Sequence, residues 1–99
     1  MSDAGCRIDI WLWRARFAPT RARAAALVER GAVRLTHRGL EVRLNKPGRT
    51  IHPGDALTFA INGRVLSVRV EALGARRGPP MEARALYSSL VGPDDTTTV

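Results

Sequence analysis

The chain has 99 residues, of which 44% are hydrophobic and 25% are charged, a mixture that fits one small globular domain and argues against general disorder. Its single cysteine excludes an internal disulfide framework, and it contains neither a run of about 20 apolar residues nor a signal-peptide pattern. We therefore expect one cytoplasmic domain without a membrane span, and the net charge of +7 points to an anionic partner.

The positive charge is concentrated in the first half of the chain. Residues 1–50 contain eleven Lys and Arg against four Asp and Glu, whereas residues 51–99 contain five of each. Fifteen of the sixteen basic residues are arginine, which binds phosphate in a bidentate manner and stacks on bases. This asymmetry favours a nucleic acid as partner, because neutralising phosphates releases counterions. A solvated basic face that only keeps the protein soluble is the alternative.

A first short helix is predicted over residues 10–16. Asp9 is its expected N-cap, and Ile8 is placed to contact Trp13 as a hydrophobic staple. Helical spacing gives an inner side of Trp11, Leu12 and Ala15 and leaves Arg7, Arg14 and Arg16 facing outward.

A second helix is predicted over residues 21–30. Pro19 should end the first helix, Thr20 should cap the second, and Gly31 should terminate it. The expected buried residues are Ala24, Leu27 and Val28, and the expected exposed ones are Arg21, Arg23 and Arg30.

Beyond residue 32 the hydrophobic period changes to two. Residues 33–44 read as a hairpin or two short strands around His37-Arg38-Gly39, and residues 49–52 as a short extended piece. The Asn62-Gly63 pair predicts a tight hairpin, because both residues tolerate the positive φ that a type I′ turn needs. Its register pairs Ile61 with Arg64, Phe59 with Leu66 and Leu57 with Val68. A basic loop and a short helix over residues 81–90 should follow.

No catalytic or metal centre is visible in the sequence. His37 and His52 each lie beside a turn, and neither has a His or Cys at ligand spacing. Cys6 has no base near it in the sequence, so a nucleophilic role is disfavoured. We expect no enzyme activity, no cofactor and no metal.

The two basic helices allow either DNA or RNA binding. A helix-turn-helix regulator reads DNA through base-contacting side chains, often Asn or Gln, but the helix at 21–30 offers only Ala, Arg, Leu, Val and Glu29. That composition favours phosphate and shape contacts, so RNA is preferred. Trp13 could stack on a base or on a guanidinium. A DNA-binding regulator and a protein-interaction module remain open.

The segment "RIDIWLWRARFAPTRARAAALVERGAVRL", followed by "NKP" and "IHPGDAL", resembles the S4 RNA-binding domain, the alpha-L motif named for small-subunit ribosomal protein 4. The matching positions, in order, are Arg7, Asp9, Thr20, Arg21, Gly31, Val33, Gly54 and Asp55. Within that superfamily, "WLWRARF", "TRARAAALVERGAV" and "ARRGPPMEARALY" look like the ribosome-associated heat shock protein 15 family.

This resemblance implies a stress-response protein that binds ribosomal RNA on free large ribosomal subunits carrying stalled nascent chains, as in ribosome rescue. It also implies that Arg7, Thr20 and Arg21 lie on the RNA-facing surface, with Lys46 beside them. A structured-RNA binder outside the ribosome is the nearest alternative. We expect a monomer with at most weak, non-specific affinity for DNA.

The expected fold class is α+β, with two N-terminal helices packed on a small antiparallel sheet and a short C-terminal helix. The expected parts are a flexible N-terminus (1–6), an S4-like RNA-binding domain (7–73), a basic loop with a helical extension (74–91) and a disordered acidic tail (92–99). The expected RNA-binding residues are Arg7, Trp13, Arg14, Arg16, Thr20, Arg21, Arg23, Arg30, Lys46 and Arg49.

Overall fold

The computed structural model describes residues 5–90 and confirms the α+β class. The described elements are β1 (Cys6–Arg7), α1 (Ile8–Arg14), α2 (Arg21–Glu29), β2 (Val33–His37), β3 (Leu40–Leu44), β4 (Thr50–Ile51), β5 (Ala56–Ile61), β6 (Arg64–Val70), α3 (Pro80–Arg84) and β7 (Tyr87–Ser89).

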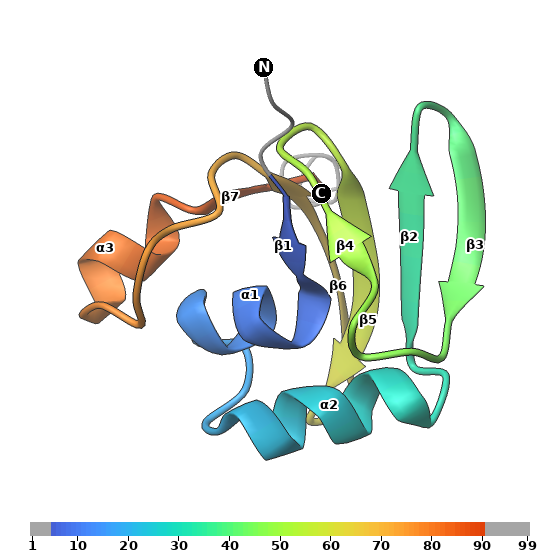
Figure 1. Ribbon diagram of the computed structural model, residues 1–99, viewed down its shortest axis with the longest axis horizontal. Coiled ribbons are helices and arrows are strands. Elements are labelled where there is room, and N and C mark those ends of the chain that lie inside the picture. The colour runs from blue at the N-terminus through green and yellow to red at the C-terminus, as the bar shows by residue number, and fades with distance from the viewer. Residues whose placement is uncertain (1–4, 91–99) are drawn as a thin grey trace, which may run out of the picture.

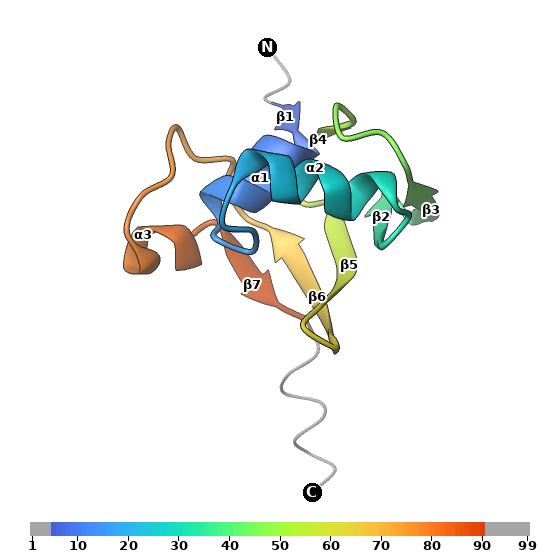
Figure 2. The same ribbon diagram turned by 90° about the horizontal axis from the view of Figure 1, so that it is seen from below.

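An antiparallel sheet with strand order β3-β2-β5-β6-β7 forms one layer of the molecule. The helices α1 and α2 lie together on one side of this sheet, and α3 lies at the end opposite the β2–β3 hairpin (Figures 1 and 2). The short strands β1 and β4 pair with each other outside the main sheet. They bring the start of α1 next to the segment that connects β3 to β5.

The core lies between the two helices and the sheet. Phe17, in the turn after α1, joins the layers, because its ring packs edge-on against Phe59 at 4.9 Å and beside Tyr87 at 4.6 Å between centroids. The indole Nε1 of Trp11 donates to the Ala72 carbonyl oxygen at 2.9 Å. The predicted buried residues of both helices are confirmed: Trp11, Leu12, Ala15, Ala24, Leu27 and Val28.

The bounds predicted for the first helix are wrong by two residues at each end. Asp9 is not the N-cap, because the helix begins at Ile8 and its first N–H groups already have backbone partners. Ile8 donates to the Arg49 carbonyl at 2.9 Å, and Asp9 donates to the Pro47 carbonyl at 3.3 Å. The turn that contains Pro47 and Arg49 thus takes the place of the predicted side-chain cap. Because Ile8 is itself the first residue of the helix, it does not stand before an N-cap as the predicted staple with Trp13 requires. The helix ends at Arg14, before Pro19, and Arg16 adopts a left-handed φ of 66°.

The second helix follows the sequence signals closely. Thr20 Oγ1 accepts from the Arg23 N–H at 3.0 Å, as an N-cap does. At the other end Gly31, with φ of 77°, donates to Val28, and Ala32 donates to Leu27. These two bonds form a Schellman motif, so the predicted glycine stop is confirmed.

Both predicted hairpins are confirmed. Arg38 and Gly39 form the two-residue turn between β2 and β3, with φ of 52° and 80°. Asn62 and Gly63 form the turn between β5 and β6, and the register is the predicted one, with Phe59 opposite Leu66. Each turn has positive φ at both central residues, the requirement of a type I′ turn.

The predicted helix over 81–90 is wrong in its second half. It ends at Arg84, and Tyr87–Ser89 instead form β7 on the edge of β6. The edge of β6 offers unpaired backbone groups, and the Tyr87 ring packs on Phe17. These two contacts outweigh the weak preference of a short segment for helix.

The predicted flexible N-terminus does not extend to Cys6, since this residue pairs with Ile51 in β1. Residues 1–4 and 91–99, which include the predicted acidic tail, lie outside the described residues. Within the part of the chain that is described, no helix has the length and apolar character needed to cross a membrane.

Candidate nucleic-acid interface

Arg7 is held in a fixed position at the start of α1. Its Nε donates to Asp9 Oδ1 at 3.0 Å and its Nη2 to Asp9 Oδ2 at 2.9 Å, a bidentate pair. The Asp9 carboxylate raises the pKa of Arg7 further above its ordinary value, so the guanidinium stays charged. The Arg7 side chain is 53% exposed while that of Asp9 is 6% exposed. An anchored cation therefore faces solvent.

The turn that follows β3 lies directly against Arg7. It is attached to α1 by the backbone bonds that Ile8 and Asp9 donate to Arg49 and Pro47. At Gly48 an added Cβ would lie 3.7 Å from Arg7 Cζ, so the turn lies beside the guanidinium. The exposed residues Lys46 and Arg49 belong to this turn, where the Arg49 N–H donates to the Lys46 carbonyl at 3.0 Å.

A hollow of about 450 Å³ opens beside this turn. Its charged lining residues are Arg43, Lys46 and Arg49, and the lining contains no carboxylate. The Arg43 side chain also reaches the end of α2, since a Cβ added at Gly31 would lie 3.5 Å from Arg43 Cδ. We call the four cations Arg7, Arg43, Lys46 and Arg49 the basic cradle. Residues far apart in the chain thus form one cationic surface.

The arginines of α2 are exposed as predicted, but they do not form one face. Arg23 and Arg30 line a second hollow of about 300 Å³ together with Leu27 and Ile61. Arg21 precedes Arg23 by two residues, which is about 200° around a helix. The side chain of Arg21 therefore points in a different direction from those of Arg23 and Arg30, although all three are exposed as expected.

Two predicted contact residues, one at the end of α1 and one just after it, are engaged within the protein. Arg14 Nη1 donates to the carbonyls of Leu73 at 3.3 Å and Gly74 at 2.8 Å. Arg16 Nε donates to the Gly78 carbonyl at 2.7 Å. These bonds tie the end of α1 to the loop before α3 and leave fewer donors for a phosphate.

Trp13 is covered by a guanidinium, one of the two partners that its position suggested. Arg77 Cζ lies 5.9 Å from the centroid of the Trp13 ring, and Arg77 Nε donates to the Trp13 carbonyl at 3.0 Å. The indole is half-buried. Stacking on a base would require Arg77 to move or the free face of the ring to be used.

Sequence reasoning missed Arg43 and Arg77. Arg43 could have been found, because alternation along its strand turns it outward together with Arg34, its partner across the β2–β3 ladder. No sequence signal identifies Arg77, since its contact with Trp13 spans 64 residues. Whether any of the ten predicted residues contacts RNA stays a prediction.

The comparisons with known proteins agree with this architecture. The model of the S4 domain family matches residues 6–36, which run from β1 to β2. Heat shock protein 15 of Escherichia coli K12 is 35% identical over 81 residues, which are 82% of this chain and 57% of that protein. A heat shock protein 15 homolog of Haemophilus influenzae is 33% identical over 88 residues, or 88% of this chain and 63% of that one. This chain thus spans about three-fifths of the length of these relatives.

A solved structure resembles the fold over nearly its whole length. It is described as the trimeric structure of heat shock protein 15 from Vibrio cholerae. The similarity has a TM-score of 0.79 at 28% sequence identity and covers 94% of this chain and 89% of that one. For the present chain, a monomer stays the prediction from sequence.

Proposed function

The chain is an S4-domain relative of heat shock protein 15, and from this premise we propose that it binds ribosomal RNA through the basic cradle. The proposed target is the large ribosomal subunit, specifically free subunits that carry a stalled nascent chain. The family resemblance supports this role, and we infer a cytoplasmic location from it.

One observation carries the RNA part of this proposal. The cradle joins Arg7, at the start of α1, to cations of β3 and of the turn after it, and backbone hydrogen bonds hold that turn on the helix. Because Asp9 holds its guanidinium, Arg7 loses little conformational entropy when a phosphate binds. Arginine adds paired N–H donors, which match two oxygens of one phosphate.

The surface suits phosphates better than base edges. The exposed side of α2 presents Arg21, Arg23 and Arg30 but no Asn or Gln. Double-stranded RNA is recognised mainly by its shape and backbone, and such contacts need cations at fixed spacing. A folded ribosomal RNA presents its phosphates at fixed spacings, which such a set of cations can match.

Two experiments test the proposal. In gradients of extracts from stressed cells, the protein should migrate with free large subunits, and its presence only at the top of the gradient would contradict the ribosomal part. In a salt series, a structured RNA should bind more tightly than duplex DNA of equal length. Equal binding to both would favour a general polyanion binder, and preference for a DNA site would favour a regulator.

A further inference from the structure

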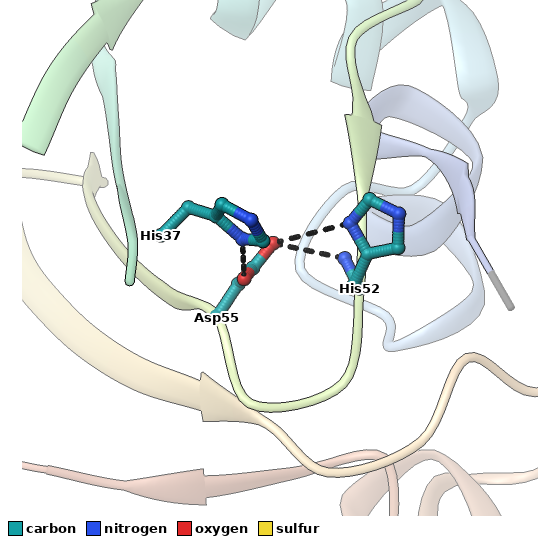
Figure 3. Close-up of side chains that lie close together, drawn as sticks. All are labelled: His37, His52 and Asp55. Atoms are coloured by element: carbon teal, nitrogen blue, oxygen red, sulfur yellow. Dashed lines mark hydrogen bonds and ion pairs between the residues drawn. The ribbon is translucent and has the colours of Figure 1, made fainter. Parts of the chain in front are cut away.

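The fold brings together three side chains that carry metal-ligand atoms, although neither histidine has a His or Cys at ligand spacing in the sequence. His37 ends β2, while His52 and Asp55 belong to the turn between β4 and β5 (Figure 3). One ligand atom from each lies within 4.8 Å of the others. Sequence spacing did not indicate this, because β2 and β5 pair only in the folded sheet.

Asp55 is the centre of the cluster and is held rigidly. Its carboxylate is buried, and Oδ2 accepts from the His52 backbone N–H at 2.9 Å. Its own N–H donates to the His52 carbonyl, and its carbonyl accepts from Val70. The other carboxylate oxygen, Oδ1, lies 2.5 Å from His37 Nδ1. A fixed carboxylate thus faces both imidazoles.

His52 has a nitrogen with no partner of its own. Its Nδ1 is buried without a hydrogen bond, 3.9 Å from Asp55 Oδ2. The dashed lines of Figure 3 show this atom directed at the carboxylate. A buried unpaired nitrogen costs free energy unless a donor or an ion fills the position. The other ring edge lies beside Gly5, since a Cβ added there would lie 3.1 Å from His52 Nε2.

We propose that His37, His52 and Asp55 form a binding site for a divalent transition-metal ion of the zinc type. Two imidazoles and one carboxylate are a known donor set for zinc, at bond lengths of about 2.0–2.2 Å. Such lengths put tetrahedral donors about 3.4 Å apart, so small rotations of the two imidazoles against the fixed carboxylate are needed. His37 binds as the tautomer that carries its proton on Nε2, and the ion separates Nδ1 from Asp55.

The surroundings leave a fourth position open. The three residues line a hollow of about 300 Å³ with Leu35, Arg49 and Thr50, and the two histidine side chains are 38% and 36% exposed. Water can complete the coordination there. Arg49 is the one cation of this lining, and its charge opposes the ion.

The test is zinc binding by the tag-free full chain, measured by calorimetry without RNA. We expect one ion per chain, with affinity lowered at least about tenfold in His37→Ala and in His52→Ala. Cys6→Ser is the control and should leave the affinity unchanged. Arg49→Gln should tighten binding, since it removes the opposing charge.

The proposal would be overturned if zinc did not bind saturably at one ion per chain, or if wild type and both histidine variants bound it equally. The cluster would then have a structural role only. Loss of binding in Cys6→Ser would overturn the proposal as well, by assigning the ion to the thiol. If the histidine variants do not fold, Co²⁺ added to the wild type decides. A tetrahedral absorption spectrum with paramagnetic shifts at both imidazoles supports the site, and shifts elsewhere exclude it.

Discussion

Arg7 binds both carboxylate oxygens of Asp9, two residues further along the chain, at 3.0 and 2.9 Å. Arg7 is exposed and Asp9 is 4% exposed as a residue. The pair therefore has two effects: it neutralises a carboxylate inside the first turn of α1, and it fixes a cation at the edge of the proposed RNA surface. Loss of Arg7 should therefore affect both folding and RNA binding.

Arg7→Ala should destabilise the fold. It leaves the buried Asp9 carboxylate without its charged partner, which lowers the unfolding free energy. Urea unfolding followed by circular dichroism measures this. Arg64→Ala, an exposed arginine of β6, is the matched control and should stay within about 0.5 kcal/mol of wild type. An Arg7→Ala variant as stable as wild type would contradict a stabilising role of the Arg7–Asp9 pair.

Arg21→Ala should weaken RNA binding without loss of stability. Arg21 is exposed in the first turn of α2, where the helix dipole and N–H groups also attract a phosphate. We expect a loss of roughly 1–2 kcal/mol in binding free energy and a salt slope shallower by about one phosphate. Arg69→Ala, on the exposed side of β6, should change neither. An equal effect of Arg69→Ala would assign binding to the sheet.

Arg14→Ala should lower stability and leave RNA binding nearly unchanged, the opposite of Arg21→Ala. It removes the bonds to the Leu73 and Gly74 carbonyls, so the loop before α3 loses its attachment to α1. We expect a loss of about 1–2 kcal/mol in stability. RNA affinity per folded molecule should be nearly unchanged. A selective loss of RNA binding at full stability would restore Arg14 to the interface.

Cys6 should react slowly with thiol reagents at neutral pH. Burial raises its pKa above the ordinary 9.0, against the lowering effect of Arg14. Because the thiolate is the reactive form, a raised pKa leaves less of it at any given pH. Alkylation of the folded protein should be slower than in urea and should accelerate only as the pH rises above 9.0. Equal rates in both states would contradict the burial of the thiol.

The parts of the fold that sequence could predict depend on local signals. Asn62-Gly63 determines both the turn and the register, and Thr20 and Gly31 determine the ends of α2. The errors arise where a distant segment supplies the partner. The Pro47 and Arg49 carbonyls replace Asp9 as the cap of α1, and β6 recruits Tyr87–Ser89 into the sheet.

The same distinction applies to the candidate site. The exposed arginines of α2 follow from helical spacing alone. The cradle does not, because it depends on the β1–β4 pairing and on the turn that this pairing places against Arg7. The cluster of His37, His52 and Asp55 likewise exists only through the pairing of β2 with β5.

The most direct test of the account compares two double variants that lose the same charge. Lys46→Ala/Arg49→Ala removes two cations of the cradle, and Arg64→Ala/Arg69→Ala removes two exposed cations of β6. Binding to structured ribosomal RNA is measured for both across a salt series. The cradle variant should bind roughly 10- to 100-fold more weakly, with a salt slope shallower by about two phosphate contacts, while the β6 variant should stay close to wild type. Equal losses in the two variants would show that net charge, and not the cradle, determines binding.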